Sequence, residues 1–265
     1  MRRILHAVLL LALGQALLGG AAEPAKIRIG VEGAYPPFSV VAPDGSLKGF
    51  DIDIAKALCA QMMVECSLVQ QDFDGMIPAL QARKIDAIIA SMSITDERKK
   101  AVGFSERYYN SPNRLIAKKG AKIALTPAGL KGKRIGVQRS TINDRYATDN
   151  FKAAQIVRYG KQDEAYLDLA AGRTDLVMVD GVAATFGFLK TPAGKDFEFT
   201  GPEYTDPRYF GYGAGVAVRK DDTELRDRFS AAIKAIRANG TYKKLQDQYF
   251  DFDIYGATPT ASAKP

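Results

Sequence analysis

The run Ile85-Asp86-Ala87-Ile88-Ile89 continues into Ala90-Ser91-Met92-Ser93-Ile94-Thr95-Asp96-Glu97-Arg98, and the fold of the chain can be worked out from this stretch. Its first part is short, apolar and rich in β-branched residues, and polar residues follow it. This pattern predicts a buried strand with Ser91 and Ser93 just beyond its carboxyl end.

A short helix is predicted to follow the strand. Thr95 can cap it, and Asp96 and Glu97 suit a first turn, where the helix dipole is positive. Arg98 has the wrong charge for that end of a helix, so it needs another role. Its planar fork of donors can bind a carboxylate at two points, beside hydroxyls and free helix-start amides. An ordinary solvated helix start is the alternative interpretation.

The amino-terminal segment has the pattern of a secretory signal peptide. Positive charge in Met1-Arg2-Arg3 precedes an apolar run, and small residues follow before Glu23, so residues 1–22 are predicted to be removed by cleavage near Ala22. No later apolar run approaches the ~20 residues that a membrane span needs. A free protein of the periplasm is therefore expected.

Composition argues for binding rather than catalysis. The net charge of +7 comes from scattered basic residues without aromatic interleaving, which favours solvated faces and no nucleic-acid partner. The single histidine, His6, lies in the predicted signal peptide, so histidine-based triads and histidine-ligated zinc sites are excluded. Neither a metal nor a cofactor is expected. Acid–base chemistry by Asp, Glu or Tyr stays possible, without a positive signal.

The two cysteines, Cys59 and Cys66, lie seven residues apart in a chain that is expected to be exported. Such cysteines favour a local disulfide. Two buried free thiols are the alternative.

Two short sequence patterns occur twice, in the same order. Lys133–Val137 repeats the pattern of Ile27–Val31, and Ala171–Asp180 repeats that of Ala82–Ser91. The repetition predicts two similar lobes built from parallel βαβ units. Ligands of such sheets bind beyond the carboxyl ends of the strands. Side chains expected at that edge, converging on one cleft, are Glu32, Ser91, Ser93, Thr141 and Asp180.

Two crossings between the lobes are predicted. Residues 108–113 form an extended polar segment, and the chain is expected to return at 209–213. The first lobe is then 23–110 plus 213–255 and the second 111–212. Residues 256–265 have the composition of a disordered tail.

The candidate cleft residues have complementary charges. Arg98 suits a carboxylate, Asp180 an ammonium group, and Glu32 adds a second anion. Tyr35 and Phe73 can enclose an aliphatic chain or a guanidinium plane, with a cation–π contribution of roughly 0.5–2 kcal/mol. Each residue has a structural alternative: a solvated acid for Glu32, a helix cap for Asp180, and core aromatics for the two rings.

Several motifs together resemble the periplasmic amino-acid-binding proteins of ABC importers, solute-binding protein family 3. The resemblance is strongest to the lysine/arginine/ornithine- and histidine-binding branch and extends to about Tyr255. The motifs are Gly49–Ala55, Ile77–Leu80, Asp86–Ile88 with Ser91–Thr95, Leu130–Val137, and Asn239–Tyr242 with Tyr249–Asp253.

The resemblance implies an α/β protein of two lobes joined by two hinge strands, which close on a ligand. It implies that Arg98 binds an α-carboxylate, helped by Ser93 and by backbone amides near Thr141 and Ile142. The cysteine pair matches the disulfide of this branch.

The resemblance also assigns the other end of the ligand. Asp180 would bind the α-ammonium group together with Ser91 and Ser93. Tyr35 and Phe73 would flank the ligand side chain, and Glu32 would meet its distal cation.

The chain departs from this branch at four positions of the site. Glu32 stands where the branch has aspartate, and Ala90 where it often has a third serine. Ile142 and Asn143 replace a threonine and a glutamine, which removes side-chain contacts but leaves the backbone amides available. We therefore expect a monomeric receptor for a basic L-amino acid, arginine first, then ornithine or lysine, that delivers its ligand to an inner-membrane ABC permease. Histidine and opines stay open as ligands. Two other hypotheses stay open. One is a prephenate/arogenate dehydratase, which uses the same fold, and the other is a sensory ectodomain or ligand-presenting partner of a receptor.

Overall fold

The central apolar run forms β6 (Ala87–Ile88), an interior strand of a five-stranded sheet. It is shorter than the predicted strand over 85–89. Pairing with β1 (Lys26–Val31) nevertheless extends along the run, because Asp86 N donates to Arg28 O at 2.7 Å and Ile89 N to Gly30 O at 3.0 Å. The residues just before and just after β6 are thus also hydrogen-bonded to β1.

The computed structural model describes residues 26–256. The predicted signal peptide over 1–22 and all but the first residue of the predicted tail over 256–265 lie outside this range. No helix within the described range is long and apolar enough to cross a membrane.

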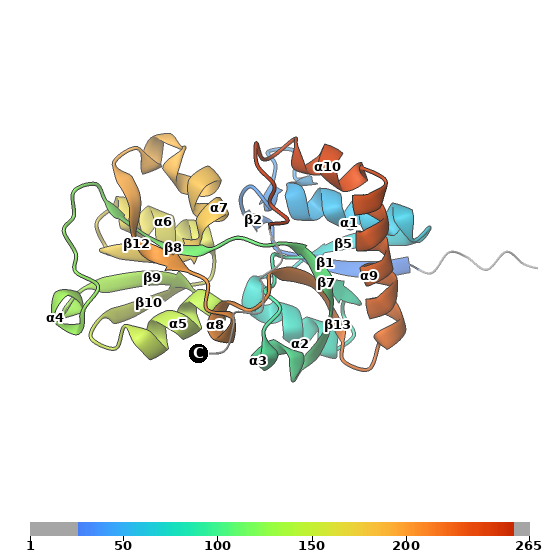
Figure 1. Cartoon of the computed structure of the whole chain (residues 1–265), viewed down its shortest axis with the longest axis horizontal. Coiled ribbons are helices and arrows are strands. Elements are labelled where there is room, and N and C mark those ends of the chain that lie inside the picture. The colour runs from blue at the N-terminus through green and yellow to red at the C-terminus, as the bar shows by residue number, and fades with distance from the viewer. Residues whose placement is uncertain (1–25, 257–265) are drawn as a thin grey trace, which may run out of the picture.

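Each of the two α/β lobes is built around one five-stranded sheet (Figure 1). In the first sheet β1 is parallel to its neighbours β5 and β6, and β13 is antiparallel to both β6 and β7. Its strand order is β5 (Glu65–Gln70), β1, β6, β13 (Ala214–Arg219) and β7 (Val102–Tyr109).

The second sheet has the same pattern of directions. Its strand order is β10 (Gln155–Tyr159), β9 (Arg134–Gln138), β11 (Leu176–Asp180), β8 (Asn113–Lys118) and β12 (Phe197–Tyr204). Here β9 is parallel to β10 and β11, and β8 is antiparallel to its two neighbours. A small third sheet consists of β2 (Ala34–Tyr35), β3 (Ser39–Val41) and β4 (Leu47–Lys48).

Helices connect the strands of each lobe. In the first lobe these are α1 (Phe50–Gln61), η1 (Phe73–Gly75), α2 (Met76–Gln81), α3 (Asp96–Lys99), α9 (Thr223–Ala238) and α10 (Thr241–Gln246). In the second they are α4 (Pro127–Leu130), α5 (Ile142–Asn150), α6 (Gln162–Ala170), α7 (Gly181–Ala184), η2 (Thr185–Leu189), η3 (Pro192–Gly194) and α8 (Pro207–Phe210). After α10 ends at Gln246, the amides of Gln248 and Tyr249 bond carbonyls three residues back.

Two segments cross between the lobes as hinge strands. One runs from β7 to β8 and the other returns from β12 by way of α8 to β13 (Figure 1). The first crossing is tied to the end of the chain, since Asn110 N donates to Ile254 O at 3.0 Å. We keep 110/111 and 212/213 as the proposed lobe boundaries.

The internal repeat corresponds to the same ion pair in both lobes. Arg28 binds Asp86 with Nε to Oδ2 at 2.9 Å, and Arg134 binds Asp175 with Nε to Oδ2 at 3.2 Å. In both pairs the aspartate also accepts the backbone amide of the arginine. Each ion pair therefore joins neighbouring parallel strands at the same position of its sheet.

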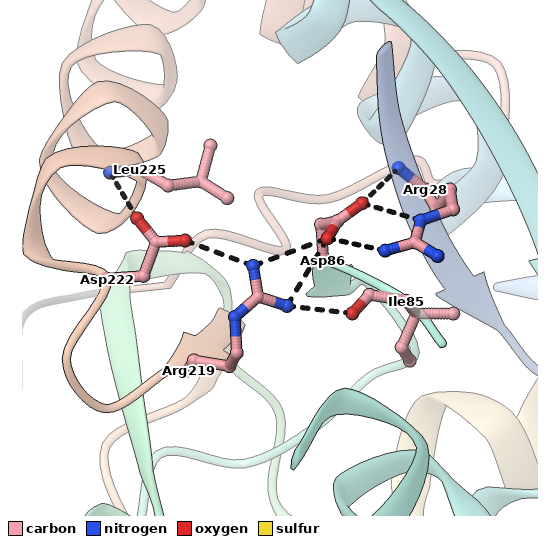
Figure 2. A network of polar contacts seen from close by, with 6 residues as sticks. All are labelled: Arg28, Ile85, Asp86, Arg219, Asp222 and Leu225. Carbon is pink, nitrogen blue, oxygen red and sulfur yellow. Dashed lines mark hydrogen bonds and ion pairs between the residues drawn. The ribbon is translucent and has the colours of Figure 1, made fainter. Parts of the chain in front are cut away.

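In the first lobe this ion pair extends into a network (Figure 2). Arg219, on β13, donates to Asp86, to the carbonyl of Ile85 and to Asp222. Asp222 caps α9 by accepting from the amide of Leu225. The network thus connects β1, the start of β6, β13 and the start of α9.

The predicted disulfide is confirmed. Cys59 and Cys66 are bonded, with their Cα atoms 6.2 Å apart. The bond joins the last turn of α1 to β5, which is an edge strand of the first sheet.

We predict that Asp86→Asn lowers the free energy of unfolding at neutral pH by about 1–3 kcal/mol, because it leaves two arginines without their shared carboxylate. Burial opposes ionisation of Asp86, but hydrogen bonds and charge from Arg28 and the charge of Arg219 outweigh it and hold its pKa below the ordinary value. Its contribution is present above the unfolded pKa of about 3.9 and is lost as pH falls through the lower folded value.

Urea unfolding of both proteins at neutral pH and at about pH 3 measures this difference. The exposed Asp96, paired with Lys99 on the surface, provides the matched control Asp96→Asn, which should change stability little. An equal loss in the two variants would contradict a special role for the network.

Candidate ligand-binding site

A cleft between the lobes, at the carboxyl ends of β1, β6, β9 and β11, contains every side chain that the sequence predicts for the site. Its volume is about 540 Å³, including the space at its open mouth. The predicted residues that line it are Glu32, Tyr35, Phe73, Ser91, Ser93, Arg98, Thr141, Ile142 and Asp180. The structure thus brings all nine together, and their contacts with a ligand stay predictions.

Glu32, directly after β1, is buried with 5% of its surface exposed, so the alternative of a solvated loop acid is wrong. Its carboxylate accepts a hydrogen bond of 2.5 Å from Nε2 of Gln138, which belongs to the opposite lobe. Burial raises the pKa of Glu32 to about 7, the Gln138 hydrogen bond opposes this rise, and the charge of Asp51 adds to it. An adjacent cation would favour the ionised form.

Gln138 is a cleft residue that the site prediction missed. It ends β9, as Glu32 follows β1, and in the aligned repeat the two occupy equivalent positions. Its amide also donates to Gly160 O at 3.3 Å. The repeat could have identified Gln138, because it places this residue at the position of Glu32 in the other lobe. An amide side chain there can donate to a buried carboxylate.

Asp180, the last residue of β11, is both a helix cap and a cleft residue. One carboxylate oxygen accepts from the amides of Val182 at 2.8 Å and Ala183 at 2.9 Å, at the start of α7. The other accepts from the hydroxyl of Ser111, in the first crossing segment. Burial raises the pKa of Asp180, and these hydrogen bonds oppose the rise. The carboxylate is thus fixed in orientation by groups that carry no positive charge.

Arg98 lies in α3, where Thr95 caps the helix as predicted by accepting from the amide of Arg98 at 3.2 Å. The guanidinium donates to Ser93 O at 3.1 Å and, across the cleft, to Ser140 O at 3.3 Å. Burial lowers its pKa to about 10, so it is still a cation at neutral pH. Both partners are neutral carbonyls, which leaves the positive charge without a counter-ion.

The amino terminus of α5 faces the same cleft. Thr141 caps this helix by accepting from the amide of Asp144 at 3.2 Å. The amides of Ile142 and Asn143 are in the first turn and have no intrahelical partner, which suits them to an anion. Asn143 also lines the cleft, and its side-chain oxygen is buried without a hydrogen-bond partner among the described residues.

Two aromatic rings complete the wall. Tyr35 stacks on Phe38, with ring centroids 5.8 Å apart. Phe73, in η1, packs in the core of the first lobe and also lies 5.4 Å from the guanidinium carbon of Arg98. The core alternative is therefore correct for Phe73, but the ring lines the cleft as well.

The three charged groups of the cleft have neutral hydrogen-bond partners but no oppositely charged partner among the described residues. None of the salt bridges formed by residues 26–256 involves Glu32, Arg98 or Asp180. Buried charges are costly unless they are paired. A ligand that carries both signs of charge would supply the missing partners. Within the same described range, no cluster of His, Cys, Asp and Glu could hold a metal ion.

Comparison with known proteins gives the relatives of this chain. It is 54% identical to the L-arginine-binding protein of Pseudomonas aeruginosa over 249 residues, which cover 93% of this chain and 96% of that protein. It is 47% identical to the lysine/arginine/ornithine-binding periplasmic protein of Escherichia coli over 257 residues, 96% of this chain and 99% of that protein.

A solved structure of a Salmonella typhimurium periplasmic binding protein, described as having high arginine specificity, has a TM-score of 0.78 and 35% identity. The match covers 85% of this chain and 99% of that one. Residues 27–252 match the family of bacterial extracellular solute-binding proteins, family 3. On this match and on the identity to its relatives, the chain belongs to the bacterial extracellular solute-binding proteins, family 3.

Proposed function

We propose that this protein is a periplasmic receptor that binds a basic L-amino acid and delivers it to an ABC permease. The observation that carries this proposal is the set of unpaired charges in one cleft: a guanidinium, Arg98, and two carboxylates, Glu32 and Asp180. A basic amino acid has one carboxylate and two cationic groups. It therefore matches the cleft charge for charge.

The positions of these groups suit an extended ligand. Arg98 and the first-turn amides of α5 would bind the α-carboxylate. Asp180 would bind the α-ammonium group with its fixed carboxylate. The ligand side chain would pass between Tyr35 and Phe73 and end at Glu32, whose second oxygen is left available by the Gln138 hydrogen bond.

Arginine is the ligand that we place first, with ornithine and lysine next. A planar guanidinium can stack between the rings of Tyr35 and Phe73 and donate to the free oxygen of Glu32, whereas an ammonium group offers a point charge. The names of the two relatives agree with this ranking, since one is an arginine-binding protein and the other binds lysine, arginine and ornithine. Histidine and opines are the alternative ligands of the same cleft.

We propose closure of the lobes around the hinges as the mechanism. The polar contacts that cross the cleft include Gln138 to Glu32, Arg98 to Ser140 O, and an ion pair of 2.6 Å between Arg139 and Asp74. A ligand that bridges the lobes would add contacts only in the closed form and so shift the population toward it. A permease can then distinguish loaded from empty receptor. We assign binding, not turnover, as the activity of this protein. We expect it to act as a monomer.

We predict that Arg98→Ala lowers the affinity for arginine by about 2–5 kcal/mol, because it leaves the ligand carboxylate buried without its counter-ion. Isothermal titration of the ligand-free protein measures this. Lys99→Ala is the matched control, since Lys99 is on the same helix but pairs with Asp96 on the surface. Near-normal binding by Arg98→Ala would exclude the carboxylate role.

We predict that Glu32→Gln reduces the preference for arginine over citrulline, which is the nearly isosteric neutral ligand. The variant removes the charge that attracts the guanidinium but keeps a similar shape, so arginine should lose about 1.5–3 kcal/mol and citrulline much less. Competition binding with both ligands gives the ratio. An unchanged ratio would mean that Glu32 does not meet the distal cation.

We also predict that arginine binds more weakly at about pH 5.5 than at about pH 8, with proton release on binding over this range. The pKa of Glu32 is raised to about 7 in the ligand-free cleft, chiefly by burial, so the carboxylate must lose a proton to bind a cation at low pH. Titration in buffers of different ionisation enthalpy counts the protons. Glu32→Gln should release fewer protons, and an equal number would assign the release to another group.

A further inference from the structure

Behind the cleft wall, α1 carries a carboxylate that the site prediction did not include. Asp51 has only 1% of its surface exposed. We propose that Asp51 is a positioning residue of the amino-acid site, which accepts the hydroxyl proton of Ser91 and so leaves that hydroxyl facing the cleft only as an acceptor for the ligand ammonium group. This inference rests on the proposed function.

A closed set of hydrogen bonds connects Asp51 to the cleft. Its Oδ2 accepts from the hydroxyl of Ser91 at 2.9 Å, and its Oδ1 accepts from the hydroxyl of Tyr108 at 2.9 Å. The hydroxyl oxygen of Tyr108 in turn accepts from the backbone amide of Ser91 at 3.0 Å. Ser91 lines the cleft, whereas Asp51 does not.

The direction of each bond follows from the chemistry of the groups. A backbone amide can only donate, so the Tyr108 oxygen accepts there and its own proton points to Asp51. An ionised carboxylate can only accept, so the Ser91 hydroxyl also points its proton at Asp51. The lone pairs of the Ser91 oxygen are then the polar feature that remains for a ligand, and they suit a donor.

The backbone of Ser91 is held in the same arrangement. Its φ of 53° lies in the left-handed region, which is uncommon for residues other than glycine. The hydrogen bond from its backbone amide to Tyr108 and the hydrogen bond from its hydroxyl to Asp51 fix both the backbone and the side chain of Ser91. This conformation is therefore stabilised by the two groups that also set the polarity of the hydroxyl.

Comparison of the lobes supports a role in binding. In the aligned repeat Ser91 occupies the position of Asp180, which is the carboxylate proposed for the ammonium group. The first lobe thus has a serine backed by a buried carboxylate where the second has the carboxylate itself.

Burial raises the pKa of Asp51 to about 7, and the hydrogen bonds from Ser91 and Tyr108 oppose the rise. A ligand cation next to Ser91 would favour the ionised form further.

Asp51 does not serve to cap the start of α1. The hydrogen bonds of the Asp51 side chain go to Ser91 and Tyr108, not to amides in the first turn of the helix. The neighbouring Asp53 is a natural comparison on the same helix. Its carboxylate accepts from the hydroxyl of Tyr249 at 2.5 Å, but Asp53 is not in contact with the cleft.

The test compares arginine with δ-guanidinovalerate, which is arginine without its α-amino group, by titration of the ligand-free protein. In Asp51→Asn the side-chain amide can donate to Ser91 while its oxygen still accepts from Tyr108. The Ser91 proton would then point into the cleft. We expect the affinity for arginine to fall about 10- to 100-fold and that for δ-guanidinovalerate to change little. Asp53→Asn is the control, which should keep the preference for arginine.

A second variant keeps the test decisive if Asp51→Asn does not fold. Ser91→Ala should also reduce the preference for arginine over δ-guanidinovalerate, and adding Asp51→Asn to it should reduce that preference no further. The proposal is overturned if either folded single variant keeps the wild-type preference. Failure of the wild-type protein to bind any basic amino acid would instead overturn the proposed function.

Discussion

The cleft holds three charged groups that form no ion pair within residues 26–256, and this constraint governs how the two lobes are arranged around it. Removing an ion from water costs several kcal/mol or more unless another charge compensates. Arg98, Glu32 and Asp180 are each fixed by neutral hydrogen-bonding groups, namely carbonyls, an amide side chain, backbone amides and a hydroxyl. These groups orient the charges without neutralising them. A ligand that has both an anionic end and cationic groups would therefore complete the cleft.

The repeated architecture explains how the charges come to face one another. The ion pairs Arg28–Asp86 and Arg134–Asp175 join equivalent parallel strands in the two sheets. Equivalent strands then end at equivalent places, so Glu32 meets Gln138 directly across the cleft. The two lobes have diverged at these positions: where one presents an acid, the other presents an amide or a serine. This difference would allow one cleft to distinguish the two ends of the proposed ligand.

Much of this arrangement follows from local sequence patterns. The repeat and the strand-end polar residues predict two lobes and a shared cleft, and the resemblance to a known family assigns roles to the predicted side chains. What could not be predicted depends on how the lobes pack. Gln138 contacts Glu32 from the other lobe, and Ser111 reaches Asp180 from the crossing segment. Asp51 looks like an ordinary first-turn acid, and only the packing of α1 against the sheet brings it to Ser91.

We infer that the cleft selects a cationic amino acid by charge. The most direct measurement is isothermal titration of the protein, freed of ligand by unfolding and refolding, against arginine, ornithine, lysine, histidine, glutamine and octopine. We expect tight binding of arginine, weaker binding of ornithine and lysine, and none of glutamine. Preference for glutamine, or no binding of any of these compounds, would rule out selection by charge, because the buried charges would then lack the proposed partners.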